Sequence, residues 1–272
     1  MTDIRMLFVQ MTSGASLQNN LDWVISELSG LQPGSVDMVI LPEMFALFGS
    51  KEQQALAKQE ASFNGPVGSV IRRLATEHGV WIVAGSVPVM DTDANSRPVA
   101  RCHVVDHHGE LMACYDKIHL FDANVTDNQG AYRESDDYSA GQNVVCFDSP
   151  WGKLGLAICY DLRFPELFRL LAEKEAQLVI VPAAFTYVTG KAHWEVLCRA
   201  RAIENGFYIA AVNQAGQHDE KRQTWGHSML VSPWGEFESL GEQAECGVFT
   251  ADFCKVEQAR SALPVHQHRK LV

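Results

Sequence analysis

The stretch "DMVILPEMF", residues 37–45, has a close counterpart in "QLVIVPAAF", residues 177–185. Each copy begins with an apolar run of strand length and continues through a proline to a phenylalanine. Because the two copies lie in opposite halves of the chain, they indicate an internal two-fold repeat in which each half folds around its own copy.

The segments on either side of the two copies follow the same order. In the first half, the strand-like runs "RMLFVQ", "VDMVILP" and "GVWIVAGSV" alternate with amphipathic helices over residues 17–28 and 67–78. In the second half, "GKLGLAICY", "AQLVIVP" and "GFYIAAVNQ" alternate with helices over residues 166–173 and 193–205. A hairpin ends each half, "VARCHVVD" with "GELMACYD" in the first and "GHSMLVS" with "GEFESL" in the second.

This order predicts the α/β class. Each half supplies one mixed β-sheet with helices on its outer face, and two such sheets packed face to face form an α-β-β-α sandwich. No linker or low-complexity tract divides the 272 residues. A single domain over residues 1–272 is therefore expected.

The composition is that of a globular protein with an acidic surface. The chain is 47% hydrophobic, carries a formal net charge of −11 and contains no basic run. Nucleic acid and anionic membrane surfaces are therefore not expected as partners, because binding to either needs clustered cations. The opening "MTDIRMLFVQ" has neither the length of a membrane span nor the pattern of a signal peptide, which predicts a cytoplasmic protein.

The seven cysteines fit neither a disulfide framework nor a zinc ribbon, because their number is odd and no C-x-x-C pair occurs. Most of them are expected to be reduced and buried. The sequence contains no cluster with metal-ligand spacing, so it predicts neither a metal nor an organic cofactor.

Two reactive side chains follow apolar strands of the predicted sheets. Sites in open α/β sheets form at the carboxyl ends of parallel strands, and this rule selects Cys159 and Glu43. Cys159 is either a buried structural thiol or a nucleophile, and a nucleophile needs a proton acceptor. No histidine follows a strand at the corresponding place, whereas burial would make Glu43 basic enough to serve. The alternative for Glu43 is a solvated loop residue or a helix-capping partner.

Two further charged residues are candidates for the same site. Lys117, in "YDKIHLFD", is flanked by apolar side chains that indicate partial burial, and a buried cation stabilises a developing oxyanion. The alternative for Lys117 is a surface charge. Glu134, in "YRES", is a candidate to hydrogen-bond the lysine and position it.

The motifs "LPEMF", "YDKIHLFD" and "CYDLRFPELFR", in this order, resemble those of the nitrilase superfamily of carbon–nitrogen hydrolases over essentially the whole chain. Later segments, "VTGKAHWEVLCRARAIEN", "HDEKRQTWGHSMLVSPWG" and "LPVHQHR", are similar to the branch of deaminated glutathione amidases, with the ω-amidases as close relatives. The resemblance implies that Cys159 is the nucleophile, Glu43 the general base and Lys117 the group that stabilises the tetrahedral intermediate. Glu134 falls on the auxiliary glutamate of the family.

The resemblance also implies contacts to the substrate. The backbone N–H of Tyr160 is expected at the oxyanion. Residues expected at the 2-oxo acid end are Arg163, Phe185 and Thr189. The planar guanidinium of Arg163 suits a carboxylate, and a structural salt bridge to Asp161 or Glu166 is the alternative. The segment "DANVTDNQGAY", residues 122–132, departs from the Gly- and Pro-rich loop usual in the family, which bears on the shape of the pocket rim.

The implied reaction is hydrolysis of an anionic amide, deaminated glutathione, to 2-oxoglutarate and cysteinylglycine through a thioester on Cys159. The alternative is ω-amidase activity on α-ketoglutaramate or another small ω-amide of a dicarboxylic acid. Two other classes of protein remain as alternatives. The first is a binding module without catalytic activity, but the presence of Glu43, Lys117 and Cys159 together argues against it. The second is a thiol redox sensor, which needs a resolving cysteine. The resemblance further implies a homodimer formed through the face that carries the helices on the nucleophile side.

Overall fold

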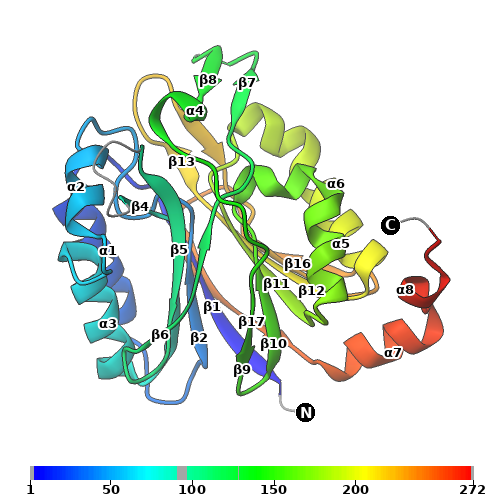
Figure 1. The fold of residues 1–272 in the computed structure, drawn as a ribbon. Coiled ribbons are helices and arrows are strands. Elements are labelled where there is room, and N and C mark those ends of the chain that lie inside the picture. Colours follow the sequence, from blue (N-terminus) through cyan, green and yellow to red (C-terminus); the bar gives the residue numbers. More distant parts are fainter. Residues whose placement is uncertain (1–2, 91–96, 128, 271–272) are drawn as a thin grey trace.

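The computed structural model describes residues 3–90, 97–127 and 129–270. Two β-sheets lie face to face, and helices cover the outer surface of each sheet (Figure 1). These four layers confirm the predicted α-β-β-α sandwich. The predicted domain also includes residues 1–2, 91–96, 128 and 271–272, which lie outside the described residues.

The first sheet is built mainly from the N-terminal half of the chain. Its strands are β1 (Ile4–Gln10), β2 (Met38–Leu41), β3 (Trp81–Ala84), β4 (Val87–Val89), β5 (Val99–Val105), β6 (Leu111–Asp116) and β17 (Glu245–Ala251). They lie in the order β17-β1-β2-β3-β5-β4, and β6 pairs with β5. The central strands β1, β2 and β3 are parallel, and β5 is antiparallel to β3, so the sheet is mixed as predicted.

The second sheet repeats this plan. Its strands are β9 (Cys146–Ser149), β10 (Gly152–Leu156), β11 (Leu178–Ala183), β12 (Tyr208–Asn213), β15 (Met229–Val231) and β16 (Phe237–Ser239), in the order β16-β15-β12-β11-β10-β9. Here β10, β11 and β12 are parallel, and β15 is antiparallel to β12. The two similar stretches of sequence therefore form the middle strands of the two parallel sets, β2 and β11.

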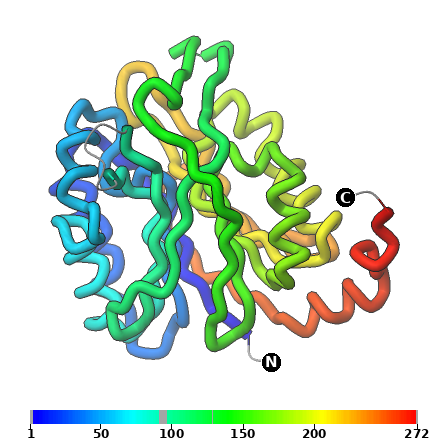
Figure 2. Tube along the Cα trace, in the orientation of Figure 1, coloured from blue at the N-terminus to red at the C-terminus, as the bar shows by residue number. Residues whose placement is uncertain are grey.

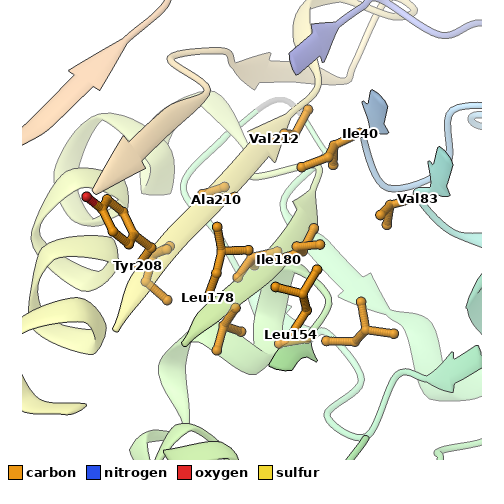
Figure 3. Close-up of a cluster of buried hydrophobic side chains, with 14 of the residues drawn as sticks. Ile40, Val83, Leu154, Leu178, Ile180, Tyr208, Ala210 and Val212 are labelled. Carbon is orange, nitrogen blue, oxygen red and sulfur yellow. The ribbon is translucent and has the colours of Figure 1, made fainter. Parts of the chain in front are cut away.

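The two sheets share one apolar core. Side chains of β2 and β3, among them Ile40 and Val83, face Leu178 and Ile180 of β11 across the interface (Figure 3). Alternate residues of β2 point outward and pack against helices instead. Since both faces of these strands are buried, the strands read as continuous apolar runs. Burial of each such side chain stabilises the fold by about 1.5–3 kcal/mol.

Helices complete the outer layers. The first sheet is covered by α1 (Leu17–Leu28), α2 (Gln53–Gln59) and α3 (Pro66–His78), and the second by α5 (Pro165–Glu173) and α6 (Tyr187–Asn205). The bounds of α1 agree with the prediction. By contrast, α6 begins at Tyr187 rather than at His193, because the Thr186 side chain caps it by accepting a hydrogen bond from the backbone N–H of Thr189.

Short elements lie at the ends of the sandwich. Around the rim near the ends of the parallel strands are the hairpin of β7 (Asp122–Asn124) with β8 (Ala131–Arg133), the short helix α4 (Glu134–Asp137), and the hairpin of β13 (Ala215–Gln217) with β14 (Gln223–Trp225). A 3-10 helix, η1, covers Cys159–Arg163. The C-terminal helices are α7 (Cys254–Ala262) and α8 (Val265–His268).

Strand β17 was not predicted from the sequence. It follows the second sheet in the chain but pairs antiparallel with β1 along its whole length, from Ile4 with Ala251 to Gln10 with Glu245. Figure 2 shows this orange segment beside the blue N-terminal strand. The chain thus returns to its first sheet, and this pairing ties the two halves together.

A helix that crosses a membrane must be long and predominantly apolar. Among the residues that the structure describes, no helix is both long enough and apolar enough to do so.

Gly85 sets the close approach of two strand ends. It follows β3 with φ +39°, and a Cβ at this position would lie 1.9 Å from the backbone oxygen of Pro42. We therefore expect Gly85→Ala to lower the free energy of unfolding by about 3–4 kcal/mol, since overpacking adds to the left-handed strain. Chemical denaturation measures this loss.

The matched control for this prediction is Gly79→Ala. Gly79 also has a left-handed φ, +64°, but nothing lies within 4 Å of the added Cβ. The control should cost about 1 kcal/mol. Equal losses in the two variants would contradict a role for the contact with Pro42.

Candidate active site

Cys159 stands at a sharp turn between a strand and a helix. Strand β10 ends at Leu156, and η1 begins at Cys159, whose φ of +47° is unusual for a residue with a side chain. Such strain persists only where the surroundings fix it, and it gathers at functional sites. The side chain lines a cavity of about 390 Å³. Cys159 therefore presents a thiol to a pocket, although its exposed fraction is only 9%.

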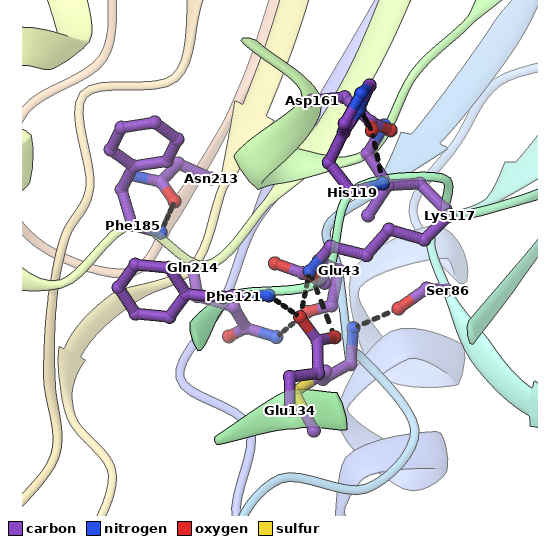
Figure 4. A network of polar contacts seen from close by, with 12 residues as sticks. Glu43, Ser86, Lys117, His119, Phe121, Glu134, Asp161, Phe185, Asn213 and Gln214 are labelled. Atoms are coloured by element: carbon purple, nitrogen blue, oxygen red, sulfur yellow. Dashed lines mark hydrogen bonds and ion pairs between the residues drawn. The ribbon is translucent and has the colours of Figure 1, made fainter. Parts of the chain in front are cut away.

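Glu43 reaches the same cavity from the first sheet. It follows β2 after Pro42 and is 4% exposed. Its backbone oxygen accepts a hydrogen bond from Gln214 Nε2 at 3.0 Å, and the next N–H, of Met44, donates to Ser86 Oγ at 2.9 Å. The two bonds fix the turn from both sides (Figure 4). Glu43 is thus a buried carboxyl group on a rigid support rather than a solvated loop residue.

Lys117 lies between two carboxyl groups. Its Nζ donates to Glu43 Oε1 at 2.7 Å and to the two side-chain oxygens of Glu134 at 2.9 and 2.8 Å. The side chain is 2% exposed, so Lys117 is no surface charge. The ammonium group is therefore paired with both carboxyl groups. Glu134, the first residue of α4, is itself held by the backbone N–H of Phe121 at 2.6 Å (Figure 4).

The charges of the cluster act on one another. Burial alone would lower the pKa of Lys117, but Glu134, Glu43 and Cys159 outweigh burial and hold that pKa well above its usual value. Burial raises the pKa of Glu43, and Lys117 only partly offsets this. Lys117 therefore stays an ammonium group, while Glu43 is a stronger base than a solvated carboxylate.

The thiol is held in its protonated form. Burial and then the charge of Glu43 raise the pKa of Cys159 well above its usual value, and Lys117 and a hydrogen bond from the backbone of Ala184 counteract them in part. A hydrogen bond between the thiol and Glu43 also favours the protonated thiol. The arrangement suits removal of the proton by Glu43 at the moment of attack, and not a thiolate formed in advance.

Asp161 joins the segment of Lys117 to that of Cys159. This fully buried carboxylate accepts from the backbone N–H of Ile158 at 2.8 Å and from Tyr115 Oη at 2.7 Å. It also accepts from the backbone N–H of His119 at 3.0 Å and lies 2.7 Å from His119 Nδ1. Tyr115 and His119 lie on either side of Lys117 in sequence, so one carboxylate fixes η1 relative to the lysine.

The structure brings the four predicted catalytic residues together. Glu43, Lys117, Glu134 and Cys159 all line the cavity. The rest of the described wall consists of Met44, Phe48, Gly49, Ser50, Lys51, Gln53, Phe121, Gln129, Tyr132, Arg133, Asp137, Tyr138, Ala184, Thr186, Arg222, Gln223 and Thr224. The catalytic roles remain predictions, but the geometry they require is present.

The four predicted substrate contacts lie beside this cavity and are absent from its described lining. Arg163 stacks over the rings of Tyr160 and Phe185, with Cζ at 5.7 and 5.2 Å from their centroids. Its Nη1 lies 3.2 Å from His193 Nδ1, so it meets His193 in place of the alternative partners Asp161 and Glu166. The binding roles of Tyr160, Arg163 and Phe185 stay predictions.

Thr189 also faces a different partner from the one expected. Its hydroxyl lies 2.9 Å from Thr186 Oγ1 within the cap of α6, and it is Thr186 that lines the cavity. Other residues of the cavity wall were not predicted from the sequence, among them Thr186, Lys51, Gln129, Tyr132, Arg133 and Arg222. The charged run "DEKR", residues 219–222, between two short strands was the available signal for Arg222.

Comparison with known proteins relates this chain to carbon–nitrogen hydrolases. The family described as "Carbon-nitrogen hydrolase" matches residues 8–260. A deaminated glutathione amidase of Yersinia enterocolitica is 38% identical over 100% of this chain and 95% of its own length. One of Dictyostelium discoideum is 34% identical over 96% of this chain and 92% of its own.

Two solved structures of similar proteins have the same fold as this chain. The NitFhit protein of C. elegans superimposes with a TM-score of 0.89 at 34% identity, covering 98% of this chain and 65% of the worm protein. XC1258 of Xanthomonas campestris, described as a CN-hydrolase superfamily protein, superimposes with a TM-score of 0.87 at 28% identity, covering 100% of this chain and 99% of that one.

The contact between Glu43 and the thiol leads to a prediction about protonation. Glu43→Gln removes a negative charge that raises the pKa of Cys159 and leaves Lys117, which lowers it. We expect the pKa of the thiol to fall in this variant, so that alkylation of Cys159 begins at a lower pH than in the native protein. Mass spectrometry of the Cys159 peptide after iodoacetamide treatment measures the pH profile.

Asp137→Asn is the control, because Asp137 is another carboxylate of the cavity wall that does not pair with the thiol in the described structure. Its profile should match that of the native protein. An unchanged or higher thiol pKa in Glu43→Gln would contradict the proposed contact.

Proposed function

Because the chain belongs to the carbon–nitrogen hydrolase family, we propose that it is an amidase that hydrolyses deaminated glutathione to 2-oxoglutarate and cysteinylglycine. The substrate is taken from relatives that bear this name at 34–38% identity over nearly the full chain. The observation that carries the chemistry is the ion pair of the buried Glu43 with Lys117 in the wall of the cavity that the thiol of Cys159 also lines.

In the proposed first stage, Cys159 forms an acyl-enzyme. Its sulfur attacks the amide carbon while Glu43 takes the thiol proton, and the carbonyl oxygen becomes an oxyanion beside Lys117. Because an ammonium group has three N–H donors and Lys117 faces two carboxyl groups, one donor is available to the oxyanion while Lys117 keeps its contact with Glu134. The intermediate then collapses, Glu43 gives its proton to the leaving nitrogen, and a thioester remains on Cys159.

In the second stage, water cleaves the thioester. Glu43, again a carboxylate, removes a proton from the water as it attacks the thioester carbon, and the thiol leaves with that proton. Lys117 faces the developing negative charge in both stages, and its raised pKa keeps it protonated throughout. A cytoplasmic location is part of the proposal, because each of the seven cysteines is a free thiol, as expected in a reducing compartment.

Turnover by the purified protein tests the substrate. We expect a kcat/KM for deaminated glutathione that exceeds the value for α-ketoglutaramate by at least about tenfold, equivalent to 1.4 kcal/mol of transition-state binding. Mass spectrometry of protein quenched during turnover should find a 2-oxoglutaryl adduct on Cys159, and Cys159→Ala should lose the adduct and the activity.

Two results would contradict this proposal. Equal or greater activity on α-ketoglutaramate would replace the main substrate with the alternative one. Full activity of Cys159→Ala would overturn the nucleophile, whatever the substrate is.

We also propose a homodimer that forms through the outer face of α5 and α6. Large apolar side chains are exposed on this face and on the turn beside it, namely Leu170, Val196, Ile203 and Trp234. Val196 and Ile203 lie seven residues apart and so share one face of α6. Exposed apolar patches of this kind are typical of protein contacts.

Sedimentation equilibrium tests this proposal. We expect Val196→Asp combined with Ile203→Asp to weaken the dimer by at least about tenfold in dissociation constant, since two charges would be buried without partners. Val248→Asp on β17 is the control, because Val248 is equally exposed but lies on the first sheet. A monomeric native protein, or equal weakening by the control, would contradict this interface.

A further inference from the structure

The wall of the cavity carries both signs of charge. Carboxyl groups of Glu43, Glu134 and Asp137 line it, and the cations of the wall beyond Lys117 are Lys51, Arg133 and Arg222. A substrate with free carboxylates meets repulsion from the first set and needs attraction from the second. The position of each rim cation therefore bears on how an anionic amide is held.

The rim cations differ in how they are held. Arg133 is engaged within its own hairpin, where Nη1 donates to the backbone oxygen of Tyr132 at 2.6 Å and Nη2 donates to Asn124 Oδ1 at 3.0 Å. Lys51 is exposed on a long flexible stem. Arg222 is different, because one side chain on another segment, Gln129, and one in its own turn, Asp219, together fix its guanidinium.

Two contacts orient the guanidinium of Arg222. Its Nε donates to Gln129 Oε1 at 2.9 Å, and its Nη1 donates to Asp219 Oδ2 at 2.9 Å. Of the five N–H groups of an arginine side chain, these use one on Nε and one on Nη1. The other three have no acceptor among the residues that the structure describes. The side chain is 33% exposed and lines the cavity, so those donors remain available to a ligand.

The hairpin that carries Arg222 is rigidly anchored. His218 lies between Ser13 and Thr224, with Nδ1 2.7 Å from the backbone oxygen of Ser13 and Nε2 2.7 Å from Thr224 Oγ1. Its ring also stacks on Phe48 with centroids 4.1 Å apart. Asp219 Oδ1 accepts from the backbone N–H of Arg222 at 2.8 Å and so closes the turn. The arginine is therefore held in place before a ligand arrives.

Two neighbouring segments are shaped around this side chain. Gly49 has φ +68°, and a Cβ added there would lie 2.3 Å from Arg222 Nη1. Gln129 is supplied by the segment 122–132, the one that departs from the family pattern. Its backbone N–H donates to Asp127 Oδ1 at 3.0 Å, which fixes the turn that carries it. Gly49 thus leaves space for the guanidinium, and the segment 122–132 supplies Gln129 as its hydrogen-bond acceptor.

We propose that Arg222 binds a carboxylate of the substrate and so selects anionic amides. This inference rests on the proposed function, which supplies a substrate with two carboxylates, one on the 2-oxo acid end and one on the glycine of the leaving group. A planar guanidinium with free N–H groups on neighbouring nitrogens holds a carboxylate by two parallel hydrogen bonds. Arg222 thus places a carboxylate-binding group in the cavity wall itself.

Steady-state kinetics of Arg222→Gln tests the proposal. Because a hydrogen bond to a charged group contributes about 1.5–3 kcal/mol, we expect KM for deaminated glutathione to rise about 10- to 100-fold. The kcat should change by less than about threefold, since the contact is made in the ground state and the transition state alike. Arg222→Lys keeps the charge without the planar fork and should recover part of the loss.

Lys221→Gln is the matched control. It removes the neighbouring cation of the same turn, which is exposed and is not part of the described cavity wall. Gly49→Ala gives a second route, because its Cβ displaces the guanidinium without removing the charge, and KM should rise again. An unchanged KM in Arg222→Gln, an equal rise in Lys221→Gln, or a loss confined to kcat would each overturn the inference.

Three amides identify which carboxylate is bound. They are deaminated glutathione, its analogue with a C-terminal glycinamide, and α-ketoglutaramate. A rise in KM confined to the first compound assigns Arg222 to the glycine carboxylate, and a rise with all three assigns it to the 2-oxo acid carboxylate. If the native protein turns over only α-ketoglutaramate, the proposed function fails, and the effect of Arg222→Gln on that KM still decides the inference.

Discussion

A lysine ammonium buried between two carboxyl groups is the interaction on which this site depends. Lys117 is 2% exposed and donates hydrogen bonds to Glu43 and Glu134. Leaving any of these groups unpaired in the interior would cost several kcal/mol, so each holds the others in place. Glu43 follows β2, Lys117 follows β6 and Glu134 begins α4. Because these three positions are far apart in sequence, the cluster forms only when the chain is folded.

The protein adds the thiol to this cluster through a second buried carboxylate. Asp161 binds η1 to the segment around Lys117 and helps to hold Cys159 in a left-handed conformation. The polar groups are thus arranged before substrate binds, and little reorganisation is left for the reaction itself. The same burial that makes Glu43 basic keeps the thiol protonated, so the two groups exchange a proton only when an electrophile is present.

The repeat and its strand patterns were sufficient to predict the sandwich, because buried parallel strands read as apolar runs and their carboxyl ends carry Glu43 and Cys159. Strand β17 was not predicted, because its partner β1 is remote in sequence. In addition, the burial of the β17 residues follows no regular alternation. The start of α6 was misplaced because Thr186 was not recognised as its cap. This cap is a local signal that the sequence carries, whereas the pairing of an edge strand such as β17 depends on tertiary context.

The same limit explains why the rim was harder to predict than the catalytic cluster. Arg163 is close to Cys159 in sequence, yet its guanidinium stacks between Tyr160 and Phe185 beside the cavity. Arg222 is remote in sequence, but Gly49, Gln129 and Asp219 hold it at the wall. Two carboxyl groups outnumber the single ammonium in the catalytic cluster, so a dianionic amide gains little attraction there. Selectivity for such a substrate therefore has to come from a cation at the rim, supplied by loops that no local pattern relates to one another.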